Sequence, residues 1–79
     1  MATNNTTFAK HYSQANNLLL TALAKPGEEF RMAYRRARLA YSSAMADSIE
    51  QVLATDLCAS IEKAARSHGC SISSPEVNA

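Results

Sequence analysis

The segment 28–68, which is more than half of the chain, contains neither proline nor glycine. Apolar residues recur along it with a mean spacing typical of an α-helix. Pro26 and Gly27 precede the segment and Gly69 follows it, so helix-ending residues stand at both of its boundaries. At roughly 1.5 Å per residue, one uninterrupted helix of this length would extend about 60 Å. The chain is therefore expected to be all-α.

A shorter helical segment is predicted at 6–24. Thr6 or Thr7 can cap its first turn, because a hydroxyl oxygen accepts hydrogen bonds from the free amides there. Apolar residues then alternate at spacings of four and three and form one seam: Phe8, Tyr12, Ala15, Leu19 and Ala22. Pro26 and Gly27 predict a tight turn after this segment. The two segments should therefore fold back on each other.

We expect a helical hairpin with a long second helix that forms a dimeric helical bundle. The short helix cannot cover the long one, so a second copy would cover the overhang. The alternative is a three-helix bundle with a break near Asp47, where Asp47-Ser48-Ile49-Glu50 resembles a capping box. We favour the continuous helix, because no residue in 28–68 forces a loop.

The chain is short enough to form only one domain. We expect a flexible N-terminus at 1–5, a single helical domain at 6–69 and a flexible C-terminal tail at 70–79. Gly69 is predicted to cap the last helix. Fifteen residues are alanines, which bury little area each but allow helices to approach closely. The core should be thin, and a partner would add to the stability of the fold.

The apolar side chains at helical spacing are the candidates for the core and for self-association. In the second segment the stripe includes Val52 or Leu53. The residues predicted for this role are Phe8, Tyr12, Leu19, Leu23, Phe30, Tyr34, Tyr41, Met45, Ile49, Leu53, Leu57 and Ile61.

Four arginines within eight residues form the strongest functional signal. Arg31, Arg35 and Arg38 stand at i, i+4 and i+7 on one helical face, and Arg36 lies beside them. None of them has an acidic residue three or four positions later. These arginines repel one another unless a negative surface lies opposite, so we predict that they bind a partner. A solvated face is the alternative interpretation.

The sequence itself contains a negative segment that could complement the arginines. Asp47, Glu50, Asp56 and Glu62 follow the arginines, with no basic residue between Leu39 and Glu62. In an antiparallel dimer, the basic segment of one copy would lie against the acidic segment of the other.

Other classes of function find little support in the sequence. The formal net charge is +1, so nucleic-acid binding is the less favoured alternative. No stretch is long and apolar enough for a membrane span, and residues 1–7 lack the pattern of a signal peptide, so we expect a cytoplasmic protein without membrane contact. The histidines and cysteines lack metal-ligand spacing, and no catalytic motif occurs. We expect no enzyme activity, no cofactor and no metal.

Part of the chain is similar to the type III secretion needle subunits. The resemblance lies in Leu23-Ala24-Lys25-Pro26, followed by Ala33-Tyr34, Leu39 and Tyr41. It implies two helices around a lysine-proline turn and a subunit that assembles with copies of itself. His68-Gly69-Cys70 and the polar residues that follow depart from this pattern.

These observations favour a small, non-enzymatic, protein-binding module that pairs with itself and contacts another protein through its arginines. Adaptors, chaperones and phage- or plasmid-type inhibitors of a host protein share this description. Nucleic-acid binding and a needle-like assembly subunit are the alternatives.

Overall fold

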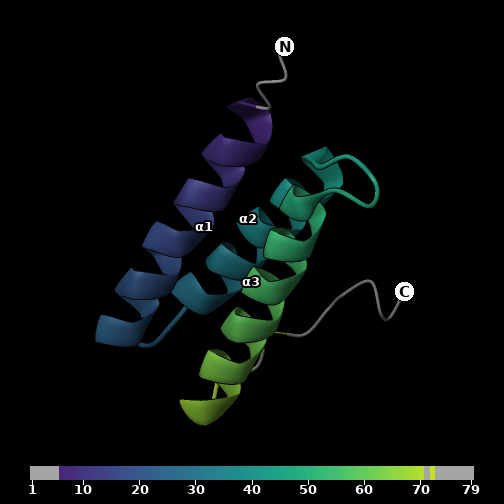
Figure 1. Ribbon diagram of the computed structural model, residues 1–79. Coiled ribbons are helices and arrows are strands. Elements are labelled where there is room, and N and C mark those ends of the chain that lie inside the picture. The colour runs from purple at the N-terminus through teal and green to yellow at the C-terminus, as the bar shows by residue number, and fades with distance from the viewer. Residues whose placement is uncertain (1–5, 71, 73–79) are drawn as a thin grey trace.

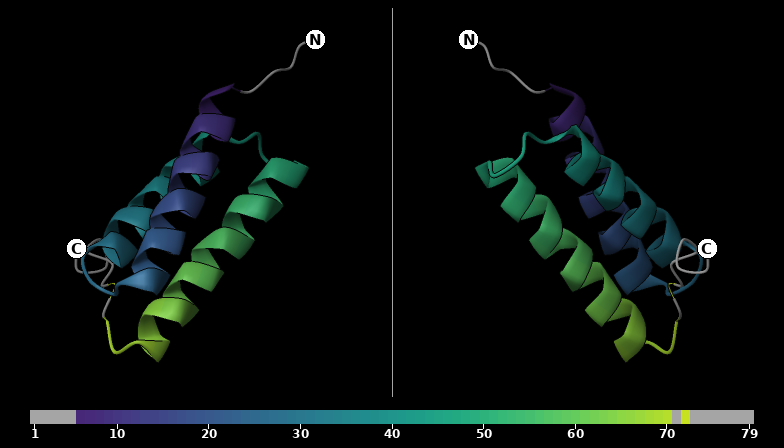
Figure 2. Two further views of the ribbon diagram at one scale, coloured as in Figure 1. Left: turned by 90° about the vertical axis from the view of Figure 1, so that its left-hand side faces the viewer. Right: turned by 90° about the vertical axis from the view of Figure 1, so that its right-hand side faces the viewer.

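The computed structural model describes residues 6–70 and 72. It contains three helices, α1 (Thr6–Ala24), α2 (Glu29–Ser43) and α3 (Ile49–Ser67). The described residues form no strand, which confirms the all-α prediction. Figures 1 and 2 show α2 running back along α1 and α3 running back along α2. Helix α2 contacts both neighbours extensively, whereas α1 and α3 touch each other least.

The turn between α1 and α2 forms where the sequence predicts it. The Lys25 backbone N–H still donates to the Thr21 carbonyl at 3.0 Å, and Pro26 ends the helix. Glu29 lies in the first turn of α2, where a carboxylate interacts favourably with the positive end of the helix dipole. The lysine-proline turn is thus a helix-to-helix connection, although a third helix follows the two that the needle-subunit resemblance implies.

The predicted long second helix is wrong, because residues 44–48 interrupt it. Ala44 is extended, with ψ at 151°, and Asp47 adopts the left-handed region at φ 63°. Neither residue is glycine or proline, which is why the break was not favoured from the sequence. The three-helix alternative with a break near Asp47 is the arrangement found. The break lets α3 fold back onto α2, so that Leu57 and Ile61 join the core inside one chain.

The capping residue of α3 is Ser48, one position later than the predicted box. Its hydroxyl oxygen accepts a hydrogen bond from the Gln51 backbone N–H at 3.1 Å and donates to the Met45 carbonyl at 2.6 Å. The Gln51 side chain reaches back and accepts from the Asp47 backbone N–H at 3.0 Å. Two side chains therefore satisfy amides that the start of a helix leaves without partners.

Gly69 ends α3 as predicted, in the left-handed region at φ 74°. The Cys70 backbone N–H donates to the Ala65 carbonyl at 2.8 Å, and the Gly69 N–H donates to the Arg66 carbonyl at 3.1 Å. This pair of bonds is the Schellman arrangement. Cys70 and Ile72 then pack against the core. The predicted flexible termini at 1–5 and 70–79 lie outside the described residues, apart from Cys70 and Ile72.

Alanines make up most of the core. Within the described ranges, the buried apolar residues include only four large ones, namely Phe8, Phe30, Leu57 and Ile61. The others are Ala15, Ala22, Ala33, Ala37, Ala40, Ala54 and Ala65. Because alanine lets backbones approach closely, the helices pack tightly while burying little side-chain area. The predicted thin core is thus present.

Five residues predicted for the core or for self-association are exposed in the single chain: Leu23, Tyr41, Met45, Ile49 and Leu53. Tyr12, Leu19 and Tyr34 are half-buried. The core prediction is wrong for the exposed five. For the four that follow Pro26, the reason is that the break divides the stripe between two helices that turn their alanines inward. In α1, Ala22 is buried and Leu23 beside it is exposed. Met45 falls in the connection, and Ile49 begins α3 at the end of the bundle. Self-association through these residues remains a prediction.

Candidate functional site

Helix α2 presents its arginines in two directions. Arg31, Arg35 and Arg38 are exposed, as expected for residues that share the helix face turned away from the core. Arg36 is half-buried and faces α1. Arg31 forms an ion pair with Glu28 at 3.7 Å, but both side chains are more than half exposed, so the pair adds little stability.

Arg36 contacts a histidine of the neighbouring helix. Its guanidinium donates a hydrogen bond to Nδ1 of His11 at 3.2 Å. A guanidinium can only donate, so Nδ1 of His11 is the acceptor in this contact. No sequence pattern pairs these two residues, which lie 25 positions apart. Among the described residues, Arg36 has no carboxylate partner.

Arg38 lies where α2 meets α3. Burial raises the pKa of the Tyr34 hydroxyl, and a hydrogen bond and the negative charge of Glu62 raise it further, while Arg38 lowers it. Burial also raises the pKa of the Cys58 thiol, against the influence of Arg38. The phenol of Tyr34 therefore lies between a carboxylate of α3 and a guanidinium of α2.

The basic and acidic segments thus meet inside one chain. The predicted antiparallel pairing of the two segments across a dimer assumed an unbroken second helix. In the folded chain, α2 and α3 are antiparallel neighbours, and Arg38 has Glu62 close by.

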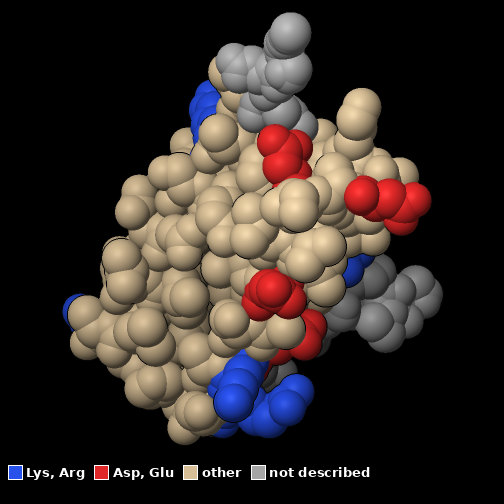
Figure 3. Space-filling view, viewed as in Figure 1, with Lys and Arg blue, Asp and Glu red and all other residues tan. Residues whose placement is uncertain are grey.

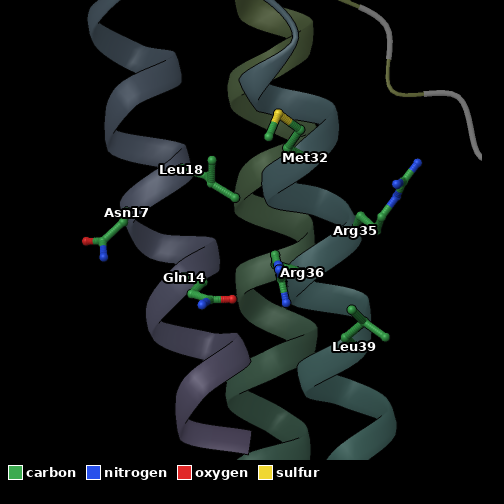
Figure 4. Close-up of a pocket in the computed structure, with 7 residues that line it drawn as sticks. All are labelled: Gln14, Asn17, Leu18, Met32, Arg35, Arg36 and Leu39. Atoms are coloured by element: carbon green, nitrogen blue, oxygen red, sulfur yellow. The ribbon is translucent and has the colours of Figure 1, made fainter. Parts of the chain in front are cut away.

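A groove of about 540 Å³ lies between α1 and α2. Its lining combines apolar side chains, amides and two cations: Gln14, Asn17, Leu18, Met32, Arg35, Arg36 and Leu39. Figure 4 shows Arg36 in the middle of the groove, with Leu18 and Gln14 pointing toward α2. Arg35 extends from the outer edge of the groove and Asn17 points away from it. Arg35 has no hydrogen bond or ion pair with another described residue.

Gln14 carries an unsatisfied polar atom beside this groove. Its side-chain Oε1 is buried and has no hydrogen-bond partner among the described residues. A buried acceptor without a donor costs free energy, about 1–3 kcal/mol in typical cases. The wall of the groove therefore contains a buried acceptor without a donor and, in Arg36, a half-buried cation without a carboxylate partner among the described residues.

A second surface is apolar and lies at the end of the bundle. We call Met45, Ile49, Val52 and Leu53 the corner patch. Their side chains are 72, 74, 57 and 41% exposed, respectively. Ile49, Val52 and Leu53 share one side of the first turns of α3, and Met45 lies in the connection that precedes them.

The molecule has an uncharged side as well. Lys10 is the only lysine, arginine, aspartate or glutamate in α1. Figure 3 accordingly shows a broad surface over α1 without charged side chains, while acidic and basic groups gather on the α3 side. Leu20 and Leu23 add exposed apolar area to α1.

The described residues contain no group of three or more histidine, cysteine, aspartate or glutamate side chains that could hold a metal ion. None of the described helices is long and apolar enough to cross a membrane. Cys58 and Cys70 are half-buried and form no disulfide.

Sequence reasoning found the arginines but missed the groove. Gln14, Leu18, Met32 and Leu39 belong to no motif, and only the packing of α1 against α2 brings them together. His11 likewise belongs to no motif, and only the packing of the helices brings it to Arg36. No family model matches the chain, and neither the curated proteins nor the solved structures compared with it include a match.

Proposed function

We propose that this protein is a non-enzymatic helical module that binds protein, and that it pairs with a second copy of itself through the corner patch. One observation carries the proposal. Among the described residues, nine large apolar side chains are exposed, whereas four are buried in the core. A small domain with this imbalance gains stability when another apolar surface covers it.

The corner patch is the part of the apolar surface best suited to self-pairing. Its members are close in sequence, so a two-fold axis can place the same patch on both copies. Met45 and Ile49 are the most exposed large apolar residues in the part of the chain that the structure describes. Three of the four patch residues, all but Val52, were predicted for self-association.

The arginine helix would remain outside this contact and free for another protein. An adaptor, a chaperone or an inhibitor of a host protein would each use one surface for self-pairing and the other for its partner. Nucleic-acid binding is a second candidate, favoured by the shared exposed face of Arg31, Arg35 and Arg38. Glu28 beside Arg31 and Glu62 near Arg38 weigh against it. A needle-like assembly subunit is a further form of the self-association proposal.

Light scattering after size exclusion, in reducing buffer and over a range of protein concentrations, tests the self-pairing. We expect the mass of a dimer for the unmodified chain. The double variant Ile49→Asp with Val52→Asp should be a folded monomer, because two carboxylates would be desolvated in the interface.

Leu20→Asp is the matched control, since Leu20 is 64% exposed on α1 and lies outside the corner patch. It should leave the dimer intact. A monomeric mass for the unmodified chain at every concentration would rule out self-pairing. Dissociation by Leu20→Asp alone would move the interface to α1.

A further inference from the structure

We propose that the groove between α1 and α2 binds an acidic peptide segment of a partner protein, in which carboxylates alternate with aliphatic side chains. This inference rests on the proposed function only in that the occupant is a protein. It concerns a different surface from the corner patch, so each proposal can fail without the other.

Arg36 places a positive charge in the groove, which favours a ligand with a negative group. Arg36 is half-buried, and among the described residues it forms a hydrogen bond with the ring of His11 and no ion pair with a carboxylate. A guanidinium has five N–H donors in a fork that matches a carboxylate, so most of its donors remain available. Arg35 at the outer edge adds a second positive charge with no ion pair among the described residues. A carboxylate would therefore bind at Arg36 inside the groove, and Arg35 would add positive charge at its outer edge.

The apolar residues of the groove lining favour a ligand that also has apolar side chains. Leu18, Met32 and Leu39 line the same groove, and the side chains of Met32 and Leu39 are 45 and 41% exposed. Methionine is flexible and adapts to irregular aliphatic partners. A peptide with acidic and aliphatic side chains covers both the cations and these residues.

A phosphate backbone fits the groove less well. Nucleic acid is held by rows of cations along the strand, and the apolar residues beside Arg36 would stay uncovered or face phosphates. The groove is also bounded on the α1 side by a helix with Lys10 as its only lysine or arginine. We therefore choose peptide over nucleic acid, and the experiment includes both.

The test is a fluorescence-anisotropy titration of the full chain with a short labelled peptide in which glutamate and leucine alternate. The matched peptide replaces each glutamate with glutamine. We expect saturable binding of the acidic peptide, and weakening by about tenfold or more for the glutamine peptide, because a guanidinium binds a carboxylate more strongly than a neutral amide.

Protein variants locate the binding. Arg36→Gln should weaken it by about tenfold or more, and Arg35→Gln should weaken it less, because Arg35 is at the edge. Arg31→Gln removes the same charge from the same helix outside the groove and should change affinity little. His11→Ala keeps Arg36 and frees its occupied donor, so it should bind at least as well as the unmodified chain.

A further variant distinguishes binding of the peptide inside the groove from nonspecific attraction to the positive charges of the protein. Gln14→Glu places a carboxylate beside Arg36, so it should abolish peptide binding while the protein keeps its helical circular dichroism and its thermal stability. The side-chain amide NMR signal of Gln14 should shift on peptide addition more than that of Asn17, which points away from the groove.

Three outcomes would overturn the proposal: no saturable binding of the acidic peptide, equal weakening by Arg31→Gln and Arg36→Gln, or tight binding of a labelled single-stranded DNA that competes with the peptide. Peptide binding by a chain that stays monomeric would contradict self-pairing alone. A protein that dimerises but does not bind the peptide would contradict only the proposal that the groove binds an acidic peptide.

Discussion

The Ser48 hydroxyl oxygen accepts a hydrogen bond from the Gln51 backbone N–H, at the point where the chain leaves its break and begins α3. The Gln51 side chain accepts in return from the Asp47 N–H. These local bonds hold the start of α3 in a segment that has neither glycine nor proline.

Ser48→Ala should lower the free energy of unfolding by about 1 kcal/mol, because it leaves amides of the first turn without their acceptor. Urea unfolding followed by circular dichroism measures the change. Ser60→Ala, at an exposed position in the middle of α3, is the control and should alter stability by no more than a few tenths of a kcal/mol. Equal effects of the two substitutions would contradict a capping role.

Gln14→Leu should raise the free energy of unfolding by about 1 kcal/mol. The substitution removes a buried carbonyl oxygen that has no hydrogen-bond donor among the described residues. It replaces the amide with an apolar side chain of similar size. Thermal and urea unfolding would both show the gain. Asn17→Leu, on the side that points away from the groove, should give no comparable increase. A loss of stability in Gln14→Leu would show that its amide is satisfied in solution.

Ala37→Leu should destabilise the fold by about 1–3 kcal/mol, since Ala37 is fully buried in the core and has no space for three more carbons. Ala59→Leu makes the same chemical change on the exposed side of α3 and should be nearly neutral. Urea unfolding of both variants checks the difference. If Ala37→Leu were tolerated as well as Ala59→Leu, the close helix packing through alanine would be refuted.

Gly69→Ala should cost about 1 kcal/mol, because an L side chain is strained at the φ of 74° found there. The added Cβ would meet no atom within 4 Å, so the cost comes from the backbone alone. Gly27→Ala is the control, since Gly27 has no positive φ and its Cβ would make an ordinary contact at 3.5 Å. Calorimetric unfolding should separate the two variants, and an unchanged midpoint for Gly69→Ala would contradict the observed cap.

The stability of the fold should decline in alkaline solution. The pKa of Cys58 is raised above its ordinary 9.0 and that of Tyr34 above its ordinary 10.0, chiefly by burial. The folded chain holds these protons more tightly than the unfolded chain, so both contributions are complete at neutral pH. As the pH rises past 9.0 and then 10.0, unfolding releases the protons and the free energy of unfolding falls.

Urea unfolding from neutral pH to above 10.0 checks this decline. Cys58→Ala should remove the part of the decline that begins near pH 9.0. Tyr34→Phe should remove the part that begins near pH 10.0. A decline that both variants leave unchanged would show that other groups cause it.

Local sequence determined the helices and their outer boundaries. Pro26 and Gly27 end one helix, Gly69 ends the last one, and the apolar periodicity makes the rest helical, because propensity and capping act within a few residues. The exposure of Arg31, Arg35 and Arg38 on one face follows from their spacing. The sequence also contained the break at 44–48, but only as a weak capping pattern.

Tertiary packing decided which of the permitted helical arrangements exists. A break in the second segment places Leu57 and Ile61 inside the same chain, where a continuous helix would leave them for a partner. The contact of Arg36 with His11 and the groove between α1 and α2 depend on that packing, because their residues are far apart in sequence. Periodicity specifies which side of a helix is apolar, whereas the neighbours available in space determine which of those side chains become buried.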